Sequence, residues 1–302
     1  MTPLHLVLLF ATILVWGCNF VAIKTGLQGM PPIFLCFARF LFSCLPAIFF
    51  IKRPPAPFKK VMGYSAVMFV LQFSLLFIGM RAGITAALAS VLLQFQSFFA
   101  IGFAILLMGE KFHFFQAIGG FVALLGIILV ATHIGGEITP LGLPLVLSAA
   151  VMWAYGSILA KKMEKGSGLS LVVWSSFYAC PPLLLLSLIL EGPDAIIDSL
   201  KNVSWIHFGS VCYISYLATL FGFGNWNRLL QFYPISKLAP FTLIVPIIGM
   251  FSSALLLGEP LQWWKLTAAC LILGGLGINL LASRSTAPVK APQTPENFKE
   301  SP

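Results

Sequence analysis

The chain has 302 residues, of which 59% are hydrophobic and only 9% are charged, and its formal net charge is +9. A soluble protein of this length needs more charge because its surface must face water, so this composition excludes a soluble globular protein. The basic residues are spread over separate short loops rather than one arm or face, which argues against a nucleic-acid partner. With a mean hydropathy of +0.97, we expect the outer surface to face a lipid bilayer.

Ten apolar runs follow one another along the chain, each long enough to cross a bilayer core of about 30 Å as a helix. Short gaps rich in Pro, Gly and charge separate them. No basic segment precedes the first run, so we expect a retained helix rather than a signal peptide. The predicted helices cover residues 4–27, 33–51, 61–80, 85–108, 114–133, 140–161, 169–190, 205–228, 236–257 and 262–283.

The Lys and Arg residues between these helices are unevenly divided between the two sides of the membrane. With the N-terminus inside, ten of them fall on the inner side and five on the outer side, and three more follow in the C-terminal tail. Because cytoplasmic loops carry the excess of Lys and Arg, we predict a multi-pass protein of the bacterial inner (plasma) membrane with both termini in the cytoplasm.

The sequence also contains an internal repeat. A Gly-Glu pair followed by two aromatic residues and a glycine-rich helix occurs at 109–115 and again at 258–264. A tryptophan eight residues before a lysine occurs at Trp16 and again at Trp153. Each half of the chain therefore contains about five helices, and an odd number of crossings inserts the second half upside down.

These observations predict an all-α membrane protein of about ten transmembrane helices, arranged as two inverted five-helix repeats. The first repeat covers 1–134 and the second covers 135–283. The remainder, 284–302, is rich in Pro, Thr, Ser and Lys, and we expect a disordered cytoplasmic tail there. Inverted repeats are a transporter architecture because two similar bundles can rock about a site at their interface.

Several short motifs occur in a specific order: Trp16-Gly17-Cys18-Asn19-Phe20, Met30-Pro31-Pro32, Ala38-Arg39-Phe40, Ala87-Leu88-Ala89-Ser90, Leu93-Gln94, Gly109-Glu110-Lys111, Ala218-Thr219, Leu238-Ala239-Pro240 and Val245-Pro246. In these motifs, nearly the whole chain before the tail resembles the EamA family of the drug/metabolite transporter superfamily. The likeness is greatest to members that export O-acetylserine and cysteine. The resemblance implies a ten-helix fold, a central cavity between the halves and efflux of amino-acid-like metabolites.

The nine acidic residues of the chain lie in loops, at helix ends or in the tail. Charges inside the membrane are costly and usually functional. A proton-driven exporter of organic cations would use a carboxylate at mid-span to hold the proton or the cation, and this sequence offers none. We therefore expect a neutral or zwitterionic substrate. No phosphate-binding loop of the GxxxxGK[ST] type is present, and the four histidines do not cluster as metal ligands, so we expect no cofactor.

Three sets of charged residues leave two interpretations open. Arg39 could pair with a substrate carboxylate, or it could reach the outer interface or a backbone carbonyl. Lys24 and Lys161 could gate the pathway or anchor helix ends at the interface. Glu110 and Glu259, which match across the repeat, are expected to complement the N-terminus of the helix that each precedes.

Uncharged polar and aromatic side chains recur at helical spacing, and such groups should turn away from lipid. On the eighth helix, the three-or-four spacing predicts one shared face. Two prolines interrupt the ninth helix and free backbone carbonyls. These residues could line a neutral polar cavity for an amino acid, or they could form hydrogen bonds between helices. With Arg39, the predicted substrate-binding residues are Trp16, Asn19, Gln72, Gln94, Ser97, Trp153, Tyr155, Tyr213, Tyr216, Thr219, Asn227 and Pro240.

The sequence thus predicts a secondary transporter, and not an enzyme, that exports cysteine- or O-acetylserine-type metabolites by alternating access. Export of another small neutral metabolite is one alternative. A membrane enzyme acting on lipid-linked substrates is a second, for which Asp194 and Asp198 share a loop. The expected partners are the small-molecule substrate and the lipid bilayer, and association as a homodimer is left open.

Overall fold

The computed structural model of the chain describes residues 1–108, 114–133, 138–161, 163, 168–233, 238 and 241–286. Within these residues, nine helical runs are long and apolar enough to cross a membrane, and a tenth apolar helix is shorter. The prediction of an all-α membrane fold with about ten transmembrane helices is therefore confirmed.

The first half contributes five spans, some of which are built from consecutive helical segments. They are α1 (Pro3–Gly29); α2 (Pro32–Cys44) with η1 (Ala47–Phe49); α3 (Phe58–Tyr64), η2 (Ser65–Leu71) and α4 (Gln72–Arg81); α5 (Ala86–Leu92), η3 (Leu93–Phe95) and α6 (Gln96–Met108); and α7 (Phe114–Ala131).

The second half repeats this plan with one additional helix outside the spans. Its elements are α8 (Gly142–Lys161), α9 (Gly168–Leu190), α10 (Pro193–Lys201), α11 (Trp205–Cys212), η4 (Tyr213–Phe221), α12 (Gly222–Phe232), α14 (Ile244–Leu257) and α15 (Trp263–Thr286).

Most predicted helix ends agree with the structure to within about one turn, and the differences have simple causes. The helix α10 was not expected, because nine amphipathic residues are too few to give a membrane signal. The helix α15 continues to Thr286, so residues 284–286 are helical rather than part of the expected tail. The remaining tail residues, 287–302, lie outside the described residues.

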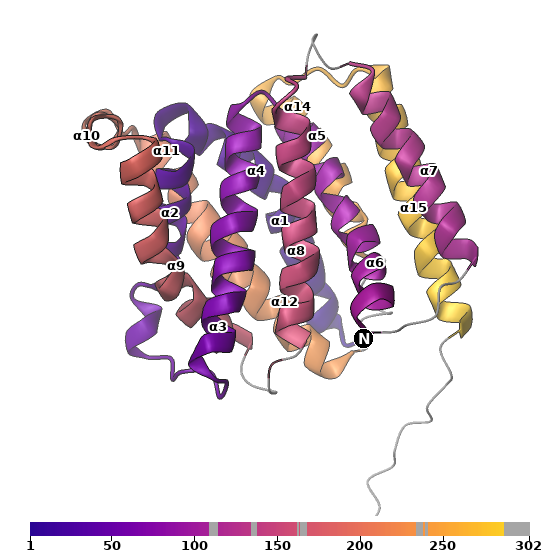
Figure 1. Cartoon of the computed structure of the whole chain (residues 1–302), viewed down its shortest axis with the longest axis horizontal. Coiled ribbons are helices and arrows are strands. Elements are labelled where there is room, and N and C mark those ends of the chain that lie inside the picture. The colour runs from indigo at the N-terminus through magenta and orange to yellow at the C-terminus, as the bar shows by residue number, and fades with distance from the viewer. Residues whose placement is uncertain are drawn as a thin grey trace, which may run out of the picture.

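The spans stand side by side, with α7 and α15 paired at one edge and α10 lying across one end of the bundle (Figure 1). Extensive contacts join α1 to α14, α2 to α9 and α4 to α8, so each of these pairs takes one helix from each half. We call the end that holds the N-terminus the N-terminal end, and the end that holds α10 the distal end. Because five spans precede α8, corresponding spans of the two halves run in opposite directions (Figure 1).

The third span of each half contains a π-helical segment, η2 in the first half and η4 in the second. In both segments a backbone N–H bonds to the carbonyl five residues earlier: Gln72 to Val67, and Gly222 to Leu217. Such wide turns are rare and often occur at functional sites. They change which side chains share a face, and both lie beside the candidate site.

Candidate functional site

Arg39 lies in the interior of the bundle, where three spans meet. Its side chain is only 2% exposed, and its Nε donates a hydrogen bond of 3.1 Å to Thr219 Oγ1 in η4. The guanidinium carbon is 4.1 Å from the centroid of the Phe73 ring in α4, within the range of a cation–π contact. The structure therefore does not show the arginine reaching the outer interface, which was one of the two interpretations of the sequence.

Several polar atoms near the middle of the spans are buried without a hydrogen-bond partner. They include Arg39 Nη1, Asn19 Oδ1 and both side-chain polar atoms of Gln72. Among the described residues, the structure records no carboxylate paired with Arg39. Because an unsatisfied buried polar group costs about 1–3 kcal/mol, and more when it is charged, such groups need an explanation. A polar ligand that meets these atoms would remove that cost.

Four aromatic rings, which we call the central aromatic cluster, connect the two halves beside Arg39. Ring centroids are 6.3 Å apart between Phe73 and Trp153, 6.2 Å between Trp153 and Phe223, and 5.5 Å between Phe223 and Trp16. The rings come from the first and third spans of the first half and the corresponding spans of the second half. The centre is therefore more aromatic than the neutral polar lining that we expected, because rings of the third and eighth spans turn inward.

Local geometry fixes the position of Trp16. Its indole Nε1 donates to the Ala218 carbonyl at 3.0 Å, and a Cβ added to Gly222 would collide with that nitrogen. Tyr213 adds a second tie, because its hydroxyl donates to the Val15 carbonyl at 2.9 Å. The absence of a side chain at Gly222 thus allows the first and eighth spans to approach closely.

The prediction of one shared face on the eighth span is wrong for Tyr216. Tyr213 turns toward α1, whereas Tyr216 is 37% exposed and its hydroxyl donates to the Leu45 carbonyl at 3.5 Å. The expected face assumed 3.6 residues per turn, and the π-helical segment breaks that period.

The fourth and sixth spans hold three further predicted residues, and no contact recorded among the described residues joins them to Arg39. Gln94 is buried and its Nε2 donates to the Thr242 carbonyl at 3.3 Å, and Ser97 is half-buried. The Tyr155 ring packs near Phe103, with centroids 5.7 Å apart. The structure therefore joins Arg39, Thr219, Trp16 and Trp153 through Phe73 and Phe223.

Two predicted site residues cannot be placed. The Asn227 side chain and Pro240 lie outside the described part of the structure. The lysine and glutamate that match Lys24 and Glu259 across the repeat, Lys161 and Glu110, also have no described side chains.

Charged side chains fasten the distal end of the bundle by binding backbone groups of other spans. Lys24 Nζ donates to the carbonyls of Met80 and Ile84 at 3.0 and 3.4 Å. The Glu259 carboxylate accepts from the N–H groups of Ala86 and Ala87 at 2.9 and 3.1 Å. Glu259 was expected to complement the helix that follows it, but it caps α5, a helix of the other half. We call these bonds the distal contacts.

A further glutamate acts in the same way on the second span. The Glu191 carboxylate accepts from the N–H groups of Ile33 and Phe34 at 2.6 and 2.9 Å, and from the Ser187 hydroxyl at 2.7 Å. Because α2 and α9 come from different halves, this bond also joins the halves at the distal end, and we count it among the distal contacts.

The fourth span is packed very differently in its two halves. All ten residues of 86–95, at the distal end, are buried. All eight residues of 96–103, toward the N-terminal end, are only half-buried. Eight residues cover more than two helical turns, so no side of this segment faces a close-packed core. The bundle is therefore tightly packed at the distal end and loosely packed along α6.

Sequence reasoning missed Phe73 and Glu191. Phe73 stands among other apolar residues of its span, and nothing in that pattern separates an inward-facing ring from one that faces lipid. Glu191 follows the seventh span, but its target at Ile33 is 158 residues away, a distance that no local pattern reports.

A helical bundle of two oppositely inserted halves, with a buried guanidinium and an aromatic cluster between them, is the architecture of a membrane transporter. The chain belongs to the EamA-like transporter family, whose pattern matches residues 4–132 and 140–281. It is accordingly a multi-pass membrane protein.

Similar proteins cover nearly the whole chain. A Salmonella typhimurium protein described as a probable amino-acid metabolite efflux pump is 40% identical over 278 residues, which cover 90% of this chain and 93% of the relative. An Escherichia coli protein with the same description is 39% identical over 94% of this chain and 97% of its own length. A solved structure, described only as the crystal structure of a protein, has a TM-score of 0.64 at 16% identity over 95% of this chain and 100% of that chain, which shows the fold alone.

Proposed function

We propose that the chain exports small amino-acid-like metabolites, of the cysteine and O-acetylserine type, across the bacterial inner membrane. The descriptions of the two relatives at 39–40% identity support the substrate class. The observation that carries the proposal is the buried guanidinium of Arg39, whose Nη1 has no partner.

A substrate carboxylate is the ligand that best suits Arg39. A guanidinium presents several N–H donors in a fixed plane and prefers a carboxylate or phosphate. Nε already donates to Thr219, and Phe73 covers one face of the group, while the buried Nη1 is a donor available to a ligand. A carboxylate here would also neutralise a charge that is otherwise costly inside the membrane.

Other buried polar atoms and rings of the same bundle could bind the remaining parts of an amino acid. The unpartnered oxygens of Asn19 and Gln72 are suitable acceptors for an ammonium group. The half-buried rings of Trp16, Trp153 and Phe223 offer apolar surface for a short side chain. A zwitterion would satisfy these groups together, whereas a lipophilic cation would meet Arg39 with a like charge.

Transport then proceeds by alternating access between the two ends. The distribution of Lys and Arg predicts that the N-terminal end is cytoplasmic, so the loosely packed α6 borders the cytoplasmic entry. The distal contacts keep the outer end closed. Export requires these contacts to open while the N-terminal end closes, a motion that inverted repeats permit.

Everted membrane vesicles test the substrate class. Vesicles with the wild-type chain should accumulate cysteine and O-acetylserine, and Arg39→Gln should lower this uptake about tenfold or more, since hydrogen bonds to charged groups contribute about 1.5–3 kcal/mol. Arg39→Lys should be intermediate because an ammonium lacks the planar donor set. Lys201→Gln, which changes an exposed cation on α10, is the matched control.

Cysteamine, which lacks the carboxylate of cysteine, separates a binding role from a structural role. Arg39→Gln should lower the preference for cysteine over cysteamine, whereas a variant that is merely misfolded should lose both in proportion. If wild-type vesicles move a lipophilic cation but neither amino acid, the proposal is wrong.

Labelling of single cysteines tests the orientation. In a cysteine-free background, a cysteine at Gly258 should react with an impermeant maleimide added outside the cell, and one at Gly109 should not. Reaction of both from the same side would contradict the inverted insertion.

A further inference from the structure

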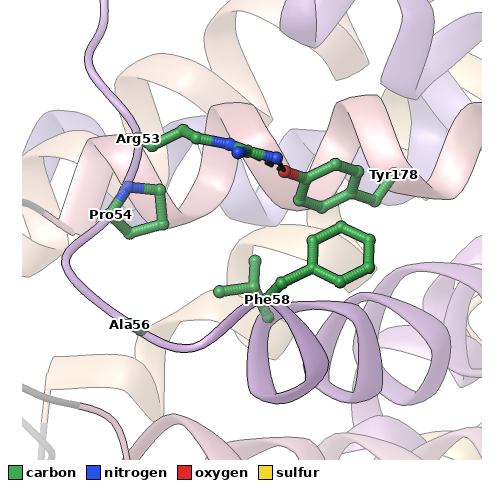
Figure 2. Close-up of a pocket in the computed structure, with 6 residues that line it drawn as sticks. Arg53, Pro54, Ala56, Phe58 and Tyr178 are labelled. Atoms are coloured by element: carbon green, nitrogen blue, oxygen red, sulfur yellow. Dashed lines mark hydrogen bonds between the residues drawn. The ribbon is translucent and has the colours of Figure 1, made fainter.

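A cleft of about 80 Å³ lies at the N-terminal end, away from the central aromatic cluster. It is formed where the loop between the second and third spans passes α9. Figure 2 shows Arg53 and Tyr178 on one side of the cleft and Phe58 below them. Its lining residues are Arg53, Pro54, Ala56, Phe58, Val61 and Tyr178.

The loop that carries Arg53 is held firmly against α9. The Trp174 indole donates to the Ile51 carbonyl at 3.0 Å, and the Ser170 hydroxyl donates to the Lys52 carbonyl at 2.5 Å. Two side chains of α9 therefore hold two consecutive loop residues in place, so this wall of the cleft is formed without a ligand.

The donors at this wall are oriented for an anion. Arg53 Nε and Nη2 donate to the Tyr178 hydroxyl at 3.1 and 2.5 Å (Figure 2), and the guanidinium carbon is 5.0 Å from the Trp174 ring centroid. Because the phenolic oxygen accepts both bonds, its own hydrogen is free to donate to a ligand. The Nη1 donors of Arg53 have no recorded partner among the described residues. Phenol and guanidinium together therefore offer neighbouring donors to one acceptor group.

Among the described residues, the charge around the cleft is positive. Segment 52–60 contains four exposed cations, Lys52, Arg53, Lys59 and Lys60, and no acidic residue. The carboxylates in the described part of the chain belong to Glu191, Asp194, Asp198 and Glu259, and all four follow or precede spans at the distal end.

Aromatic side chains close to the cleft residues in the sequence are also exposed. Phe49 and Phe50 are 78% and 82% exposed, and Phe58 and Phe177 are exposed beside the cleft. In Figure 1 this loop lies at the outer edge of the bundle. Cations that stand next to exposed aromatic rings at the end of a span lie at the level of lipid headgroups, and clusters of four or more bind anionic lipids.

We propose that this cleft binds the phosphodiester headgroup of an anionic phospholipid such as phosphatidylglycerol. Arg53 Nη1 and the Tyr178 hydroxyl contact the phosphate oxygens, the three lysines add attraction at longer range, and the phenylalanines pack against the acyl chains. The ligand is a membrane lipid rather than a soluble phosphate, because the exposed aromatic rings near the cleft can pack against acyl chains but gain no contact with a hydrated inorganic anion.

Native mass spectrometry of the purified full chain tests this site. The protein in detergent is titrated with phosphatidylglycerol or with phosphatidylcholine of the same acyl chains. We expect the wild type to bind phosphatidylglycerol at least about fivefold more tightly, since one cation near an anionic lipid contributes about that factor. Arg53→Gln should remove most of this preference, Tyr178→Phe should reduce it, and Lys201→Gln, an exposed cation at the distal end, should leave it unchanged.

Two outcomes would overturn the proposal. The first is an unchanged preference in Arg53→Gln, and loss of the preference in the triple variant Lys52→Gln, Lys59→Gln, Lys60→Gln would then indicate diffuse attraction without a cleft. The second is displacement of the lipid by an equal concentration of inorganic phosphate. Thermal unfolding of each variant in the same detergent verifies the fold, and Tyr178→Phe, which keeps the ring, provides the test if Arg53→Gln does not fold.

Discussion

The two parts of the fourth span, residues 86–95 and residues 96–103, differ in how deeply their side chains are buried. Residues 86–95 are buried without exception, and the first two of them bond to Glu259 across the boundary between the repeats. Residues 96–103 are all half-buried. One span therefore combines a tightly packed distal part with a loosely packed N-terminal part, which is the asymmetry that the proposed alternating access would reverse.

The distal contacts are well suited to opening and closing. Lys24, Glu191 and Glu259 bind backbone N–H or carbonyl groups rather than oppositely charged side chains. When such a bond breaks near the membrane surface, water can satisfy both partners, because backbone groups and charged groups are well hydrated. Opening the distal end thus exchanges hydrogen bonds and leaves the apolar core of each half intact.

Removal of the Glu259 carboxylate should have the largest effect on this asymmetry. Glu259→Ala leaves the N–H groups of Ala86 and Ala87 without their acceptor, so the start of α5 should open to water. In a cysteine-free background, a cysteine at Ala87 should react with an impermeant maleimide about tenfold faster or more, since bonds to charged groups contribute about 1.5–3 kcal/mol.

Glu259→Gln keeps one acceptor oxygen and should have a smaller effect. Asp194→Asn changes an exposed carboxylate at the same end and is the control. Equal labelling rates in Glu259→Ala and the parent would show that the distal end is held closed by other contacts.

A pair of glycines compares packing at the two ends directly. A Cβ on Gly79 would lie 2.8 Å from Val146 Cγ2 and 3.2 Å from the Gly142 carbonyl, whereas a Cβ on Gly102 in α6 would meet nothing within 4 Å. Gly79→Ala should destabilise the protein by about 1–3 kcal/mol through overpacking. Gly102→Ala should be neutral or stabilise it by up to about 1 kcal/mol, because alanine favours a helix. Thermal unfolding in detergent measures both, and equal shifts would contradict the packing contrast.

Loss of the Lys24 ammonium should loosen the distal end to a smaller extent. Lys24→Gln can keep one of the two bonds to the carbonyls of Met80 and Ile84. We expect maleimide labelling at Ala87 to rise about fivefold or less, which corresponds to about 1 kcal/mol for one hydrogen bond. Lys201→Gln serves as the cation control. If Lys24→Gln raised the labelling rate more than Glu259→Ala does, Lys24 rather than Glu259 would make the stronger distal contact.

The exposed carboxylates of α10 should have the smallest effect. Asp194→Asn combined with Asp198→Asn should leave cysteine uptake by everted vesicles within about twofold of the wild type, because exposed surface substitutions change little. Loss of activity at normal expression would instead favour the membrane enzyme that the sequence left as an alternative.

The fold could be predicted further than the site. Hydropathy and the repeat were sufficient for the spans, because a bilayer requires long apolar helices whatever their neighbours are. The amphipathic α10 and the π-helical segments fall outside these rules. The position of Thr219 against Arg39 depends on the wide turn of η4, and the partners of Glu259 depend on how the halves pack. Sequence periodicity reports neither of these, so residue types were predicted more reliably than their contacts.

The wide turns at Ser65–Leu71 and Tyr213–Phe221 have a consequence for chain length. A π-helical turn holds about one residue more than an α-helical turn needs. Deleting one residue inside either segment would therefore turn the wide turn into an α-helical turn while the two ends of the span keep their relative rotation. The same deletion elsewhere in the span would swing every side chain beyond it by about 100° around the axis. These two spans should thus tolerate a one-residue deletion at the wide turn, a tolerance that we do not expect of the other spans in the described part of the chain.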